Sequence, residues 1–115
     1  MIKNDTVRLH HILDAAQEAV ALYRSSHSCA DLSTQRMLSL SLVRLLEIVG
    51  EAARGVSPAF REAHPDIAWK KMIGMRDRLI HGYFDVNLDM VRETVIEDLP
   101  FLIAQLEKVM ALQNE

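Results

Sequence analysis

Cysteine, proline and glycine are scarce in this sequence, at one, three and four of its 115 residues. The single cysteine, Cys29, excludes an internal disulfide and is typical of a protein in a reducing compartment. Because helix-breaking residues and β-branched runs are both rare, the composition favours helices over sheets. No apolar run approaches the roughly 20 residues that a membrane span needs, and residues 1–5 lack the apolar stretch of a signal peptide. We therefore expect a soluble, cytoplasmic protein in which residues 1–115 form one helical domain.

An excess of positive charge is also missing from the chain. Thirteen lysines and arginines face sixteen acidic residues, which gives a net charge of −3 and argues against a wide basic face for nucleic acid. Lys70, Lys71, Arg76 and Arg78 nevertheless crowd one segment, whereas the chain from Asp85 onward is mainly acidic. A local basic site of this kind suits a short, well-held phosphate ligand better than a long duplex. The alternative is that the lysines only solvate a helix face.

Apolar residues recur every three or four positions along most of the chain, which predicts amphipathic helices packed as a bundle. The first helix should begin after Asn4 or Asp5, either of which could cap it, and end at the serine cluster of residues 25–28. The second should be capped within residues 31–33. It should end at Gly55, a position where helices commonly terminate in a left-handed residue.

Two further helices are expected within residues 57–81. Ser57 and Pro58 have the pattern of an N-cap followed by a first helical residue, which predicts a short helix over residues 59–63. A proline then ends this helix, and Asp66 can cap the next one, which should run over about 67–81. The sequence thus places a short helix directly before a longer one.

The last helix should be capped by Asp85 or Asn87. Pro100 lies inside its apolar pattern and removes one backbone donor, so we expect the helix to kink there or to divide in two. The predicted fold class is therefore all-α, an antiparallel bundle of four main helices plus one short helix.

The segment in which chemistry is most expected combines a guanidinium, an imidazole and a phenol within eight residues, Arg76-Asp77-Arg78-Leu79-Ile80-His81-Gly82-Tyr83. Arginine presents a rigid fork of donors that matches phosphate oxygens, and histidine can give or take a proton near neutral pH. Arg76 and His81 would lie about 140° apart on a continuous helix. Unwinding at Gly82 would let His81 and Tyr83 turn toward Arg76. These residue types together indicate work on a phosphodiester.

Several other residues have simpler interpretations. No set of ligands indicates a metal, since His10 and His11 diverge on a helix and the remaining histidines fall near loops or in the motif. The carboxylate pair Glu47 and Glu51 could resemble an acid/base dyad or metal site, but the nearby arginines Arg44 and Arg54 favour a surface ion-pair network. Trp69 and the six methionines are best interpreted as core or dimer contacts. An arginine and a histidine near a helix C-terminus are also what the helix dipole favours.

The Arg-x4-His-x-Tyr pattern of Arg76, His81 and Tyr83 has a matching context over nearly the whole chain. That context comprises Ile48-Val49-Gly50-Glu51-Ala52-Ala53, Ser57-Pro58-x-Phe60-Arg61, His64-Pro65-x-Ile67-x-Trp69, Ile73-Gly74-Met75 before the motif, Phe84-Asp85 after it, and Thr94-Val95-Ile96-Glu97-Asp98-Leu99-Pro100. On these residues the sequence resembles HEPN-domain proteins. It is most similar to the HepT-type toxins of the two-gene HEPN/minimal nucleotidyltransferase toxin–antitoxin modules.

This resemblance implies a HEPN-type helical bundle and a specific activity. HepT toxins are metal-independent ribonucleases that use no cofactor and act as homodimers, with the motif helices of two subunits lining one cleft. Arg76 would hold the scissile phosphate, His81 would serve as general acid/base, and Asp77 would support the pair. Arg78, Lys70 and Lys71 are further candidates for contact with RNA.

The resemblance also implies a regulatory partner. A nucleotidyltransferase antitoxin would form a complex with the homodimer, which could assemble into a larger hetero-oligomer, and would inactivate it by transferring AMP to Tyr83. The added bulk and negative charge beside Arg76 would block entry of the phosphate.

Two functions of other classes remain open at this point. The protein could be a non-catalytic nucleotide- or RNA-binding subunit of a nucleotidyltransferase complex, which nucleotide binding without RNA turnover would favour. It could also be a helical dimer that sequesters a partner through an apolar face, in which case its effect would survive removal of Arg76 and His81.

Overall fold

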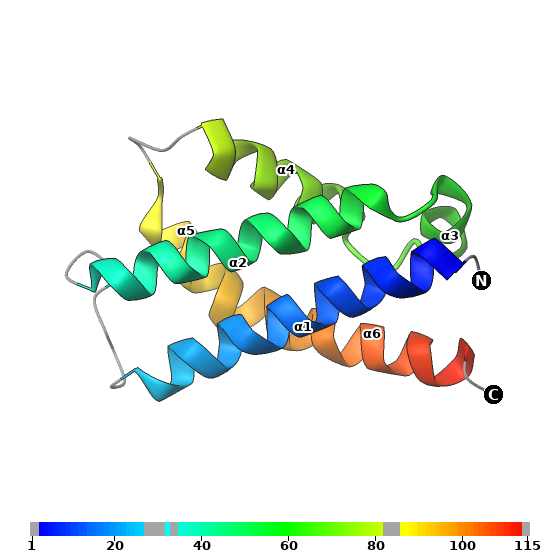
Figure 1. Ribbon diagram of the computed structural model, residues 1–115, viewed down its shortest axis with the longest axis horizontal. Coiled ribbons are helices and arrows are strands. Elements are labelled where there is room, and N and C mark those ends of the chain that lie inside the picture. The colour runs from blue at the N-terminus through cyan, green and yellow to red at the C-terminus, as the bar shows by residue number, and fades with distance from the viewer. Residues whose placement is uncertain (1–2, 27–31, 33–34, 82–85, 114–115) are drawn as a thin grey trace.

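The computed structural model describes residues 3–26, 32, 35–81 and 86–113, and in these ranges the chain is helical with no strand (Figure 1). The predicted all-α class is therefore confirmed. The elements in chain order are α1 (Lys3–Ser25), α2 (Arg36–Gly55), α3 (Pro58–Ala63), α4 (Trp69–His81), α5 (Leu88–Glu93), the π-helical turn η1 (Thr94–Asp98) and α6 (Leu99–Gln113).

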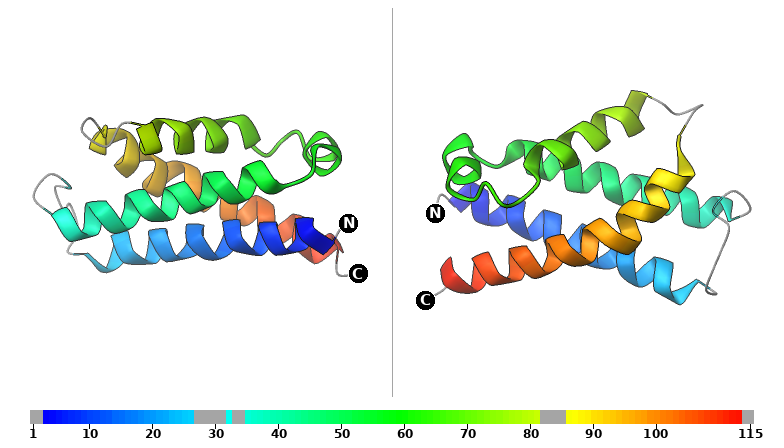
Figure 2. Two further views of the ribbon diagram at one scale, coloured as in Figure 1. Left: turned by 45° about the horizontal axis from the view of Figure 1, so that its top comes forward. Right: turned by 180° about the vertical axis from the view of Figure 1, so that it is seen from behind.

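The helices pack as a layered bundle around α1 and α2 (Figure 1). These two long helices lie side by side, α4 packs on α2, and α6 packs on α1. Seen from behind in Figure 2, the last helix crosses over α1 and α2, and α4 lies along the edge of the α2 side. The predicted apolar stripes form the core, in which the most completely buried large side chains are Leu9, Ile12, Leu42, Leu46, Ile67, Leu99 and Leu106.

The first helix begins before its predicted cap. Since α1 starts at Lys3, Asp5 lies in its first turn instead of capping it. Asp5 is 2% exposed, and its carboxylate accepts hydrogen bonds from Ser57 N (2.8 Å) and Ser57 Oγ (2.7 Å). Ser57 Oγ in turn accepts from Phe60 N at 3.2 Å, so Ser57 caps α3 as predicted. Asp5 therefore ties the start of α1 to the start of α3.

Two other predicted N-caps are wrong. Helix α2 begins at Arg36, with Gln35 at the N-cap and no side-chain cap bond. Its start is held instead by Ser39, whose hydroxyl donates to the carbonyls of Gln35 and the buried Leu32. The predicted capping residues 31 and 33 themselves lie outside the described residues.

Helix α4 begins at Trp69, two residues after the predicted start, so Asp66 does not cap it. The preceding residues form turns that bury Ile67 and Trp69, and Trp69 Nε1 donates to His64 O at 2.9 Å. Burial of these two side chains thus outweighs the capping preference of Asp66.

Gly55 is the last residue of α2 but does not adopt the predicted left-handed conformation, and the chain leaves the helix through an extended Val56. A Cβ at Gly55 would lie 2.7 Å from Arg8 Nε and 2.8 Å from Arg8 Cζ. Gly55 therefore matters because its missing side chain leaves room for the Arg8 side chain of α1, and not because it adopts a left-handed backbone conformation.

The last helix is capped by Asn87, whose Oδ1 accepts from Met90 N at 3.0 Å, as predicted. It is interrupted before Pro100 by the π-helical turn η1, in which Leu99 N donates to Thr94 O. A proline ring clashes with the carbonyl four residues earlier in an α-helix, and the wider π turn relieves this clash. The predicted kink near Pro100 is confirmed, and Figure 2 shows the helix bending through this region.

Candidate functional site

The candidate site lies where α4 crosses α2, and Gly50 determines how closely the two helices approach. A Cβ at Gly50 would collide with Arg76 Cβ and would lie 2.7 Å from Met72 O. Only a residue without a side chain fits at this contact, because the obstruction includes backbone and a Cβ atom. Gly50 therefore places Arg76 of α4 directly against α2.

The guanidinium of Arg76 is held by two carboxylates, one from each helix. Nη1 donates to Asp77 Oδ1 at 2.8 Å, and Nη2 pairs with Glu51 Oε2 of α2 at 2.9 Å. Nε is buried and has no hydrogen-bond partner among the described residues. The hydrogen bond that Arg76 donates to Asp77 and the negative charges of Glu51, Asp77 and Glu47 raise the pKa of Arg76 above its ordinary value. The site thus presents a fixed, permanently charged cation of which 21% is exposed.

The pKa of Asp77 is shifted in the opposite direction to that of Arg76. The hydrogen bond from Arg76 lowers the pKa of the Asp77 carboxyl below its ordinary 3.8, and the positive charges of Arg76, Arg54 and His81 act in the same direction. Because the pKa is lowered in the folded state, this pair stabilises the protein above about pH 4. The stabilisation is lost as the pH falls through the folded-state pKa.

We expect the ¹³C NMR titration of the Asp77 carboxyl to have its midpoint below 3.8 in the wild-type protein. In Arg76→Ala the midpoint should rise toward the ordinary value, because the hydrogen-bond donor and its charge are gone. Arg24→Ala, at an exposed residue in the last turn of α1, is the control and should leave the Asp77 midpoint at its wild-type position. An unchanged Asp77 midpoint in the variant would show that Arg76 does not hold this carboxylate in solution.

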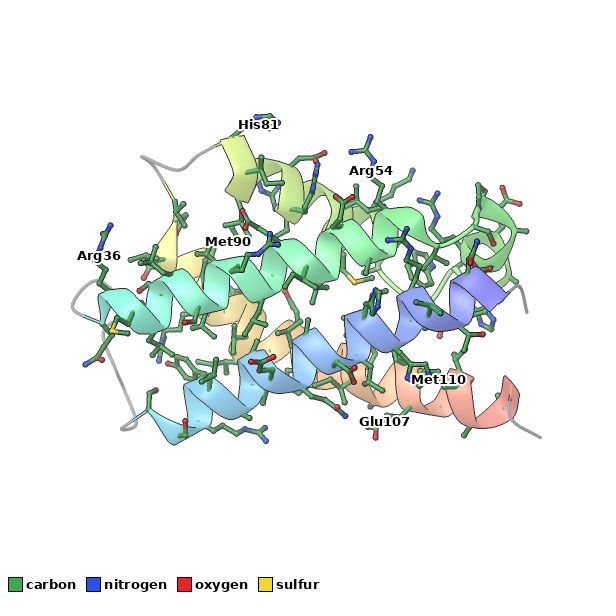
Figure 3. All side chains as sticks on the ribbon, in the orientation of Figure 1. Arg36, Arg54, His81, Met90, Glu107 and Met110 are labelled. Atoms are coloured by element: carbon green, nitrogen blue, oxygen red, sulfur yellow. The ribbon has the colours of Figure 1, made fainter. Side chains whose placement is uncertain are left out.

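His81 is the last residue of α4 and is exposed. It lies one helical turn after Asp77, on the same face, and its positive charge contributes to the lowered pKa of Asp77. Figure 3 shows His81 and Arg54 both pointing outward along the same edge of the bundle. Asp77 is therefore the residue that links Arg76 and His81, since it accepts a hydrogen bond from Arg76 and its carboxyl is influenced by the charge of His81. Gly82 and Tyr83 lie outside the described residues, so their predicted turn toward Arg76 stays a prediction.

Comparison with known proteins assigns this arrangement to a family. A family model described as "Ribonuclease HepT-like" matches residues 12–109. The chain belongs to the HepT-like ribonuclease family. The match covers α2 and α4 completely, and with them every residue of the Arg76 site.

Individual relatives of the HepT-like family agree with this assignment. The chain is 37% identical to "Putative RNase TTE0752" of Caldanaerobacter subterraneus, over 93% of each chain. It is 39% identical to "Probable ribonuclease HepT" of Thermococcus cleftensis over 69% of this chain and 72% of the relative. It is 33% identical to "Putative RNase MJ1380" of Methanocaldococcus jannaschii over 88% and 92% of the two chains. No solved structure matches the chain.

The three residues predicted to contact RNA do not lie together in this HepT-like fold. Lys70 is exposed and, seven residues before Asp77, shares its face of α4. Lys71 and Arg78 instead line a cavity of about 410 Å³ between α4 and the bent last helix. Lys71 pairs there with Asp98 at 2.9 Å. Lys70 is thus the one of the three whose helix face is shared with Asp77.

Sequence analysis assigned Glu51 to a surface network and missed its contact with Arg76. The predicted network is present in part, since Arg44 pairs with Glu47 at 3.6 Å. The available signal was Gly50, because a glycine inside a helix often marks the close approach of another helix. The interpretation of Trp69 and the methionines as core is confirmed for Trp69, Met72, Met75 and Met110, whereas Met37 is 85% exposed.

Among the described residues, no three or more histidine, cysteine or carboxylate side chains form a group able to hold a metal ion. Within the same ranges, no helix has the length and apolar character to cross a bilayer.

Proposed function

We propose that this chain is the toxin of a toxin–antitoxin pair and acts as a metal-independent endoribonuclease through Arg76 and His81. The observation that supports the proposal is the position of Asp77 on α4 of a HepT-like ribonuclease, where it accepts a hydrogen bond from Arg76 and is influenced by the charge of the exposed His81. The family supports RNA as the substrate. A cationic arginine and a histidine near neutral pH support a mechanism in which side chains supply the positive charge and the proton transfer without a metal ion.

In this proposal His81 removes the proton from a ribose 2′-OH. The 2′-oxygen then forms a bond to the adjacent phosphorus, the bond from phosphorus to the 5′-oxygen breaks, and the leaving oxygen takes up a proton from the His81 imidazolium, which returns the histidine to its neutral form. Arg76 neutralises the negative charge that builds up on the phosphate oxygens, while Asp77 keeps the guanidinium in place. The products are a 2′,3′-cyclic phosphate and a 5′-hydroxyl end.

A homodimer would complete the cleft. Exposed apolar side chains occur on both helices of the site, with Met37 and Leu40 on α2 85% and 55% exposed and Ile80 on α4 37% exposed. Leu40 lies eleven residues, about three turns, before Glu51 and so on the same face of α2. Burial of these side chains against a second copy would bring two basic sites together and deepen the positive potential.

Tyr83 is the proposed point of regulation. A nucleotidyltransferase antitoxin would direct the phenol oxygen of Tyr83 to the α-phosphorus of ATP, and pyrophosphate would leave. The attached phosphate would place negative charge close to Arg76 in sequence and compete with RNA for it.

The proposal is tested by expressing the chain alone and together with a nucleotidyltransferase encoded next to it. We expect growth arrest that requires both Arg76 and His81 and that the partner relieves. Intact mass spectrometry of the co-expressed protein should show added AMP units that are absent in Tyr83→Phe. Arrest by Arg76→Ala/His81→Ala equal to that of the wild type would contradict a catalytic toxin. Nucleotide binding without turnover of any RNA would instead support the non-catalytic subunit.

A further inference from the structure

The guanidinium of Arg76 has a restricted set of donors for an incoming anion. Its Nε is buried and unpartnered among the described residues, so this nitrogen is directed into the protein. An anion can therefore be received only by Nη1 and Nη2. Both of these nitrogens already contact carboxylates, Asp77 at 2.8 Å and Glu51 at 2.9 Å. A phosphate could use the second N–H group of Nη1 and of Nη2, but it would then lie beside both carboxylates, whose negative charges oppose it unless one of them moves away.

The two carboxylates differ in how easily they can leave. Asp77 adjoins Arg76 in sequence and has a short side chain, so both partners of this contact belong to α4 and the carboxylate cannot move far from the guanidinium. Glu51 extends from α2, has a longer side chain and is 57% exposed, compared with 48% for Asp77. An exposed ion pair between two helices contributes little stability and is readily exchanged. Glu51 is thus the carboxylate that can move into solvent.

We propose that Glu51 is an exchangeable counter-ion that occupies the phosphate position on Arg76 until substrate displaces it. This inference rests on the proposed function only in taking RNA as the source of the phosphate. Glu51 holds the guanidinium in its binding orientation, and it also competes with the ligand. Its removal should therefore strengthen the binding of anions at Arg76.

The chain offers a matched control in Glu47, one turn earlier on the same helix. Glu47 contributes its negative charge to the field at Arg76, but its carboxylate pairs with Arg44. Glu47→Gln therefore removes the same charge without vacating the position on Arg76. A difference between Glu51→Gln and Glu47→Gln isolates the contact from the general effect of charge.

The first experiment measures the Kd of a single-stranded RNA oligonucleotide by fluorescence anisotropy in a His81→Ala background, which prevents turnover. We expect Glu51→Gln to bind about fivefold more tightly than its parent and Glu47→Gln to change Kd less than about twofold. The gain should disappear when Arg76→Ala is added, because no donor then remains to be released. Equal effects of the two glutamine variants, or weaker binding by Glu51→Gln, would overturn the proposal.

A second measurement separates this inference from the ribonuclease proposal. The Arg76 Nε–H resonance is followed by NMR while inorganic phosphate is added to two proteins, the wild type and the single variant Glu51→Gln. Saturation at a lower phosphate concentration in Glu51→Gln, without RNA cleavage by the wild type, would support the counter-ion and contradict the ribonuclease. RNA cleavage by the wild type together with identical phosphate titrations of the two proteins would support the ribonuclease and contradict the counter-ion.

Discussion

Replacement of Arg76 by alanine is expected to lower kcat/KM for RNA cleavage about 100-fold to 1,000-fold, the usual range for loss of one donor to a developing anion. His81→Ala should lower it about 100-fold to 10,000-fold, because proton transfer from the 2′-OH then has no positioned base. The two losses should not add, since both residues act on the same transition state. Cleavage of a fluorescent RNA under single-turnover conditions measures both effects.

Two arginines provide the controls for this prediction. Arg24 is exposed in the last turn of α1, away from α4, so Arg24→Ala should leave cleavage unchanged. Arg78 lies on α4 but lines the cavity on its other side, so Arg78→Ala should have a smaller effect than Arg76→Ala. Cleavage rates that are equal in the wild type, Arg76→Ala and His81→Ala would contradict the assignment of the site.

Replacement of Gly50 by alanine is expected to destabilise the protein by about 1–3 kcal/mol, the usual cost of overpacking a tight contact. The added methyl would collide with Arg76 Cβ and Met72 O, so α2 and α4 must move apart. This movement also displaces the guanidinium, and misplacement of a catalytic group by about 1 Å can cost about 100-fold in rate. Urea unfolding and RNA cleavage on the same sample measure the two effects.

Gly74 is the matched control, because it is also a glycine inside a helix of the site. A Cβ at Gly74 meets nothing within 4 Å. Gly74→Ala should therefore stabilise the protein by about 0.5–1 kcal/mol, as expected for removal of a flexible residue from a helix. If Gly50→Ala were as stable as Gly74→Ala, the close approach of α2 and α4 would not exist in solution.

The bundle could be predicted from sequence because it depends on local patterns. The apolar spacing, the Ser57 and Asn87 caps and the position of Pro100 each gave an element that the structure confirms. Caps were wrong where tertiary burial decided the helix start, as with Ile67 and Trp69 before α4. Capping preferences of about 1 kcal/mol are smaller than the gain from burying such side chains.

The site could be predicted only in part for a related reason. Arg76, Asp77 and His81 are close in sequence, so a single motif revealed them together. Glu51 reaches Arg76 from another helix at 2.9 Å, and no spacing rule within one helix predicts that contact. The π-helical turn was also missed, because its wider hydrogen-bond pattern is a response to Pro100 and to the packing of α6.

The central claim is that Arg76 and His81 cleave RNA without a metal ion, and the chemistry of the product ends tests it most directly. Unmodified protein is incubated with RNA in excess EDTA, and the fragment ends are identified by mass spectrometry. We predict cleavage that yields 2′,3′-cyclic phosphate and 5′-hydroxyl ends and that is lost in Arg76→Ala/His81→Ala. Cleavage that requires an added divalent ion, or that persists in the double variant, would contradict the claim.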